Sequence, residues 1–119
     1  MRTLSSVDPA ADVACTLPLS GVKDRLTALQ VLIGGRLDGV TRVGDRLSIR
    51  IERRGDDDAL EARAAAWAQA EKGCCAFLGF AIESDPRAVT LEIVAPTGAE
   101  PTLDGIGWIV RAAGRQGAP

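Results

Sequence analysis

The sequence of 119 residues contains no histidine and no tyrosine, and it has only two phenylalanines and two tryptophans. The absence of histidine excludes a Ser-His-Asp triad, histidine acid–base catalysis and zinc sites that combine cysteine with histidine. The scarcity of aromatic residues argues against a stacking platform for single-stranded nucleic acid. Any chemistry must therefore use thiols, carboxylates, cationic side chains, hydroxyls or the backbone.

The chain also lacks a long apolar run and a strong net charge. No stretch approaches the roughly 20 apolar residues that span a bilayer, and the N-terminus shows no signal-peptide pattern. The net charge of −2 gives no electrostatic reason to expect nucleic acid or an anionic membrane as a partner. Three cysteines are too few, and odd in number, for a disulfide framework, so we expect a cytoplasmic protein with reduced thiols.

Hydrophobic periodicity predicts alternating helices and strands. Apolar residues at helical spacing predict helices over residues 20–35, 56–73 and 101–114, and Leu60, Ala64, Trp67 and Glu71 are expected to share one helix face. Alternation of apolar and polar residues predicts strands within 13–17, 38–54, 76–83 and 88–96, with hairpin turns at Gly44-Asp45 and at residues 84–87. Gly34-Gly35 and Gly73 are expected to end the first two helices.

This order predicts an α+β fold, a mainly antiparallel sheet with two to three helices packed on one face. Residues 1–12 are expected to be a mobile N-terminal arm, residues 13–112 a single domain, and residues 113–119 a flexible C-terminal tail. Trp67 and Trp108 are expected in the core or in an interface, and a homodimer that buries Trp108 is one expectation. The arginines of residues 46–54 are expected on a solvated strand face, and the Asp56–Asp58 run is expected to cap a helix.

The three cysteines are the strongest functional signal. Cys74 and Cys75 are adjacent at a predicted helix-to-strand junction, where loop torsions can turn both sulfur atoms toward one point. Thiolates are soft ligands that favour Cu(I), mercury and trivalent arsenic. Together with Cys15, the pair would supply the two or three sulfur atoms that such ions require. Glu71 is the acid closest to the pair in sequence, one helical turn before Cys75, and it is the candidate proton carrier.

The residues "ACTL", "EKGCCAFLGFAIE" and "VTLEIVAPTGAE" resemble a group of small, uncharacterised bacterial proteins with the pattern Glu-x-x-Cys-Cys-x-Phe-Leu-x-Phe. Some members of that group are associated with mercury resistance. A fainter similarity is to the core of organomercurial lyase, which would imply that Cys15 and Cys74 attack a carbon–mercury bond. That family places an aspartate three residues after the early cysteine, where this chain has Pro18. The resemblance thus favours metal binding over bond cleavage.

We therefore expect a thiol protein that binds a soft metal or metalloid ion, or its organic derivative, through Cys15, Cys74 and Cys75. No other cofactor is expected, and enzymatic cleavage stays open. One alternative is a redox switch based on a vicinal disulfide. Another is a small structural or dimeric domain in which the cysteines only pack. We also expect the sulfur of Cys15 to lie close to the pair, which should be accessible from a cleft lined by Trp67, Phe77 and Phe80.

Overall fold

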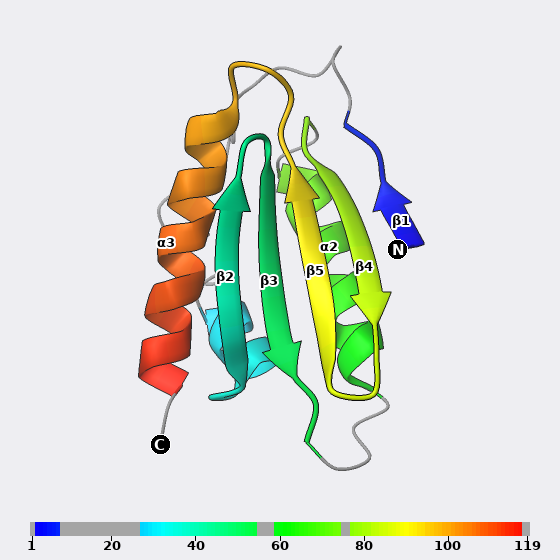
Figure 1. The fold of residues 1–119 in the computed structure, drawn as a ribbon, viewed down its shortest axis with the longest axis vertical. Coiled ribbons are helices and arrows are strands. Elements are labelled where there is room, and N and C mark those ends of the chain that lie inside the picture. Colours follow the sequence, from blue (N-terminus) through cyan, green and yellow to red (C-terminus); the bar gives the residue numbers. More distant parts are fainter. Residues whose placement is uncertain (1, 8–26, 55–58, 75–76, 118–119) are drawn as a thin grey trace.

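The structure is a computed structural model that describes residues 2–7, 27–54, 59–74 and 77–117. Five strands form one sheet in the order β1-β4-β5-β3-β2, and every neighbouring pair is antiparallel (Figure 1). The elements in chain order are β1 (Arg2–Ser5), a helical segment over residues 27–33, β2 (Leu37–Val43), β3 (Arg46–Glu52), α2 (Leu60–Cys74), β4 (Gly79–Ser84), β5 (Ala88–Val94) and α3 (Glu100–Gly117). The predicted α+β class is confirmed.

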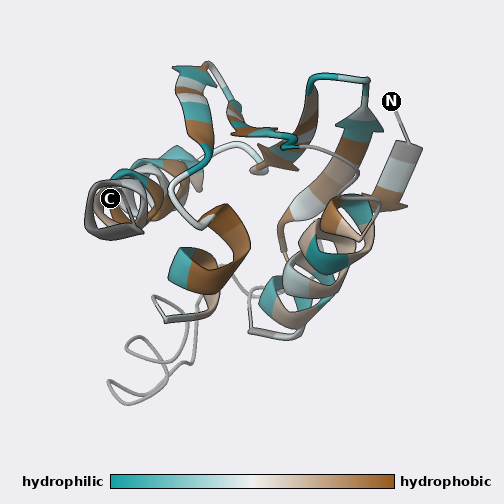
Figure 2. Cartoon of the chain, turned by 90° about the horizontal axis from the view of Figure 1, so that it is seen from below, coloured by the Kyte–Doolittle hydropathy of each residue, from teal (hydrophilic) through white to brown (hydrophobic). Residues whose placement is uncertain are grey.

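The molecule has two layers, because α2, α3 and the 27–33 helical segment all lie on the same side of the sheet (Figure 2). On β3, Leu47, Ile49 and Ile51 face the helices, and each pairs with an apolar residue of β5. Arg46, Ser48, Arg50 and Glu52 alternate with them and lie on the open face. The alternation in the sequence therefore predicted correctly which face of this strand is buried.

Two predicted turns are confirmed by glycines in the left-handed region. Gly34 and Gly35, with φ of 54° and 77°, end the 27–33 helical segment. Gly44, with φ of 59°, occupies the first position of the two-residue loop between β2 and β3. A positive φ at that position alone is the pattern of a type II′ turn, which suits the twist of a hairpin.

Close approach to the sheet accounts for one interior glycine of α3, Gly114, whereas Gly107 makes only an ordinary contact with the sheet. A Cβ atom at Gly114 would lie 2.6 Å from Leu37 Cδ2, and one at Gly107 would lie 3.4 Å from Leu47 Cδ1. Arg111 Nη2 also donates a hydrogen bond of 3.4 Å to Val40 O, a carbonyl of the edge strand β2. The helix thus packs closely on the sheet and covers part of one sheet edge.

Some boundaries differ from the prediction. Residues 2–5, inside the predicted arm, form the edge strand β1, and α3 continues to Gly117 within the predicted tail. Gly73 is not a left-handed cap, because α2 runs through it and ends at Cys74. Burial of Trp67 in the core is confirmed. Trp108, however, has an exposed fraction of 67% and is not a core residue of this chain.

Candidate thiol site at the end of α2

Of the three cysteines, the structure describes only the backbone of Cys74, so the candidate thiol site is defined by the residues that surround it. Cys74 is the last residue of α2, and only its backbone is described. Cys15 and Cys75 lie outside the described residues, as do the predicted strand at 13–17 and the Asp56–Asp58 cap. The predicted approach of Cys15 to the pair therefore stays a prediction.

Glu71 lies in the last turn of α2, and its exposed fraction is only 3%. Leu60, Ala64 and Trp67 of the same helix are also buried, so the predicted shared face is confirmed. Among the described residues, Glu71 is the one charged residue that is buried. Burying a carboxylate costs free energy unless its surroundings compensate for lost hydration. Glu71 is thus a buried acidic side chain one turn before the cysteine pair, and it remains the candidate acid of this helix end.

Lys72 joins three parts of the chain beside the cysteines. Its Nζ atom donates hydrogen bonds of 2.9 Å to Ser6 O, just after β1, and of 2.6 Å to Leu78 O, just before β4. The positive charge of Lys72 also lies in the last turn of α2, where it interacts favourably with the negative end of the helix dipole. Lys72 therefore links Leu78, which follows residues 75–76 in the chain, to the end of α2.

The N-terminal chain reaches the same place. A Cβ atom built on Gly79 would lie 2.8 Å from Val7 N and 3.3 Å from Ser6 C. The backbone of residues 6–7 thus crosses directly over Gly79, at the start of β4. Gly79 is five residues after Cys74, and Val7 is eight residues before Cys15. The fold consequently brings the chain on both sides of Cys74 and Cys75 to the same end of the sheet as residues 6–7, which precede Cys15.

An apolar groove runs along α2 toward this end. It has a volume of about 380 Å³, and its walls come from α2 and from the 27–33 helical segment. Val31, at 71% exposure, belongs to its rim. The residues that line it are Ala28, Val31, Leu32, Arg63, Ala66, Trp67 and Ala70. The next positions on the same helix face, three and four residues after Ala70, are Gly73 and Cys74. Gly73 is exposed and has open space where a Cβ atom would lie.

The predicted cleft of three aromatic residues is wrong. Phe77, Phe80 and Trp67 all belong to the hydrophobic core, with exposed fractions of 7% or less. Trp67 contributes only part of its surface to the groove described above. Within the described ranges, no group of three or more Cys, Asp, Glu or His side chains could hold a metal ion. None of the described helices is long and apolar enough to cross a membrane.

The predicted basic strand face carries ion pairs that the sequence did not reveal. Arg46 Nη1 lies 2.6 Å from Glu92 Oε1 across the β3–β5 pair. Arg50 Nε lies 2.8 Å from Asp38 Oδ2, and its Nη1 lies 3.3 Å from Asp85 Oδ2. Glu92 and Asp85 lie 46 and 35 residues along the chain from their arginines, so only the packing of the sheet brings these pairs together. Asp38 lies 12 residues from Arg50, across the predicted hairpin.

Comparison with known proteins adds no family. No family model matches the chain, and no curated protein or solved structure is significantly similar to it. The resemblance drawn from the cysteine motif therefore stays a prediction, and function has to be argued from the geometry at the end of α2.

Proposed function

We propose that the protein binds a soft metal or metalloid ion, of the mercury, trivalent arsenic or copper(I) class, through the thiolates of Cys15, Cys74 and Cys75. The observation that carries the proposal is that the chain on both sides of Cys74 and Cys75 meets residues 6–7, which precede Cys15, at one end of the sheet. Residues 6–7 cross Gly79, and Lys72 binds both Ser6 O and Leu78 O. A helix end, a loop and the N-terminal chain are thus held beside one another.

Chain length makes a three-thiol site reachable. Along the sequence, 58 residues separate Cys15 from Cys74, and a loop of that length alone would rarely bring two thiols together. The contact between Val7 and Gly79 replaces this loop with two short arms of eight and five residues. An arm of eight residues spans at most about 29 Å when fully extended, and less in any folded form. Proximity of the thiols then costs about 1 kcal/mol less in chain entropy.

The buried carboxylate supports a proton-carrying role for Glu71. Metal binding by thiols releases protons, because the ligand is the thiolate. A carboxylate in the turn that leads to the pair can accept such a proton or orient a ligand. In the proposal Glu71 acts beside the metal and is not one of its ligands. Cleavage of a carbon–metal bond is not required by this role.

The apolar groove supports an organic derivative as one form of the ligand. The groove follows the α2 face on which Gly73 and Cys74 are the next positions. An aryl or alkyl group attached to a thiol-bound metal would find apolar side chains there, and burial of such a group is favourable. A bare ion makes no use of the groove, so the two ligand forms can be separated experimentally.

The test is titration of the fully reduced protein under anaerobic conditions with Hg(II), Cu(I), arsenite and phenylarsine oxide. We expect dissociation constants well below about 1 μM for Hg(II), and at least about a hundredfold loss in the Cys74→Ser/Cys75→Ser double variant. Cys15→Ser should weaken arsenite, which takes three thiolates, more than Hg(II), which takes two. Glu71→Gln should change proton release more than affinity, and the exposed Glu83→Gln is its matched control.

Two results would contradict the proposal. One is micromolar or weaker binding that the double cysteine variant leaves unchanged. The other is a stable vicinal disulfide, seen as a loss of two mass units after mild peroxide, combined with no metal affinity in the reduced form. The second result would assign the pair to redox switching instead.

A further inference from the structure

A second feature lies at the opposite end of the sheet from Cys74, around the turn between β4 and β5 (Figure 1). A hollow of about 450 Å³ opens there on the sheet face that the helices leave uncovered. Its lining is almost entirely charged and comes from β2, β3, the residue after β3 and the β4–β5 turn. The lining residues are Asp38, Arg50, Glu52, Arg53, Pro86 and Arg87.

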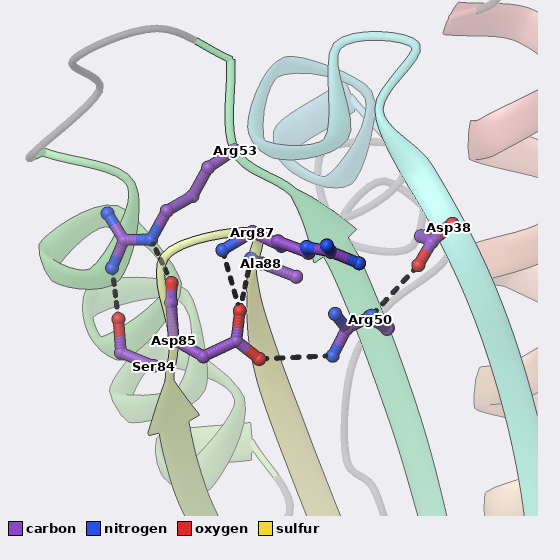
Figure 3. Close-up of polar contacts among 7 residues, drawn as sticks. All are labelled: Asp38, Arg50, Arg53, Ser84, Asp85, Arg87 and Ala88. Atoms are coloured by element: carbon purple, nitrogen blue, oxygen red, sulfur yellow. Dashed lines mark hydrogen bonds and ion pairs between the residues drawn. The ribbon is translucent and has the colours of Figure 1, made fainter.

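Asp85 organises the arginines of this hollow (Figure 3). Its Oδ1 atom accepts hydrogen bonds from the amides of Arg87 at 2.7 Å and Ala88 at 2.8 Å, and its Oδ2 atom lies 3.3 Å from Arg50 Nη1. Its carbonyl oxygen accepts a hydrogen bond of 2.9 Å from Arg53 Nε. The amide hydrogen bonds from Arg87 and Ala88 are the main reason why the pKa of Asp85 is lowered. The side chain of Asp85 therefore fixes the turn to Arg50, and its backbone carbonyl holds Arg53.

Arg87 differs from the other two arginines. Arg50 is held by Asp38 and Asp85, and Arg53 also donates to Ser84 Oγ. The guanidinium group of Arg87 makes no hydrogen bond or ion pair within the part of the chain that the structure describes. It lines the hollow together with Arg50 and Arg53, so three like charges border one space, and the five donors of Arg87 are available to a ligand.

The acidic residues of the hollow restrict what can bind. Asp38 lies on one wall beside Arg50, and Glu52 lies on another, 3.7 Å from Arg54 Nε. A polyanion such as a nucleic-acid backbone would place further phosphates against these carboxylates and be repelled. A single planar or tetrahedral oxyanion matches the guanidinium fork and brings only one charged group into the hollow. The space around it is large enough for a small organic body.

We propose that this hollow is a binding site for a small organic molecule that carries one oxyanion group, held by Arg87 with support from Arg50. The group is a carboxylate or a phosphate monoester, because a guanidinium fork binds both in the same bidentate way. The site is independent of the thiol site and does not rest on the proposed metal function.

The experiment uses the full chain labelled with nitrogen-15 at low ionic strength, with phenyl phosphate and benzoate as probes. The two probes share a ring and differ in the oxyanion, and benzyl alcohol is the neutral control. We expect saturable amide shifts at Arg87 and Ala88 with at least one oxyanion probe below about 10 mM. Whichever probe binds more tightly identifies the phosphate or the carboxylate as the source of the oxyanion.

Arg87→Gln removes the guanidinium group without removing any side-chain contact of the described structure, so it should fold normally. It should weaken the bound probe at least about tenfold, as loss of a charge-assisted hydrogen bond does. Arg111→Gln is the control, because it also removes one positive charge but lies on α3, outside the lining of the hollow. It should weaken binding of the probe less than about twofold. The proposal is overturned if neither probe saturates, if benzyl alcohol gives the same shifts, or if both variants lose affinity equally.

Discussion

Replacement of Gly79 by alanine tests the crossing that holds the N-terminal chain at the end of the sheet. The new Cβ atom would lie 2.8 Å from Val7 N and 3.1 Å from Val7 Cγ2. The closest atom belongs to the backbone, so rotation of a side chain cannot relieve the contact. Residues 6–7 must move, and the hydrogen bond from Lys72 Nζ to Ser6 O, 2.9 Å long, weakens with them.

The magnitude follows from three contributions. Overpacking costs about 1–3 kcal/mol, and the weakened hydrogen bond adds about 1 kcal/mol. Replacing glycine within a strand returns roughly 0.5–1 kcal/mol, because the unfolded chain loses conformational freedom. The net expectation for Gly79→Ala is a loss of about 1–3 kcal/mol in the free energy of unfolding, together with faster amide exchange in β1.

Gly105→Ala is the matched control. Gly105 lies in α3, has no positive φ and has open space where the Cβ atom would be added. The same substitution there should stabilise the protein by about 0.5–1 kcal/mol, because alanine favours a helix over glycine. Urea unfolding followed by circular dichroism measures both variants. A Gly79→Ala protein as stable as the wild type, with β1 amides still protected, would refute the crossing.

Three further predictions concern single side chains, each measured by urea unfolding. Folding lowers the pKa of Asp85 below its ordinary value of 3.8, so the carboxylate stabilises the protein at neutral pH and this contribution fades as the pH falls below 3.8. The difference in free energy of unfolding between the wild type and Asp85→Asn should therefore narrow from pH 6 to about pH 3. A difference that stays constant over this range would contradict the expectation. Lys72→Met removes the hydrogen bonds to Ser6 O and Leu78 O and should cost about 1–3 kcal/mol, whereas an unchanged midpoint would show that the clamp contributes nothing. Gly44→Ala forces a left-handed φ on alanine and should cost about 1–2 kcal/mol, and Gly44→Asn should cost less.

Elements whose apolar residues recur at a regular spacing could be predicted from the sequence, and the short edge strand could not. The alternation in β3 and β5 and the helical spacing in α2 correctly indicated the buried faces. The four residues of β1 contain a single apolar side chain, Leu4, so no alternation marks them. That strand depends on pairing with β4 and on Lys72, which are contacts between distant parts of the chain.

Glycines were ambiguous in the sequence for a physical reason. Gly34 and Gly44 take positive φ and end or turn the chain, as predicted. Gly73 and Gly107 have no positive φ and lie inside helices. The residue type permits both conformations, and the choice depends on what packs nearby: a Cβ atom at Gly114, also inside α3, would lie 2.6 Å from Leu37 Cδ2.

The two candidate sites were predictable to different degrees. Spacing alone placed Glu71 on the buried face of its helix, one turn before the cysteine pair, because a helical period relates residues within one segment. The arginine hollow combines β2, β3 and the β4–β5 turn, and its contacts depend on strand register. A register between distant strands follows from the packing of the whole sheet, and so it was not readable from any one segment.

The separation of the two sites gives a last prediction. Strand β4 starts at Gly79, near the thiol end, and finishes at Ser84, beside the arginine hollow. Five residue steps of a strand cover about 17 Å, about two Debye lengths at physiological ionic strength. The charge of Arg87 should therefore have little effect on thiolate formation at Cys74. Arg87→Gln should change Hg(II) affinity by less than about twofold, and its effect should be additive with that of the double cysteine variant. A larger effect of Arg87→Gln on metal affinity, measured in the same anaerobic titration, would show that the sheet couples its two ends and would contradict independent sites.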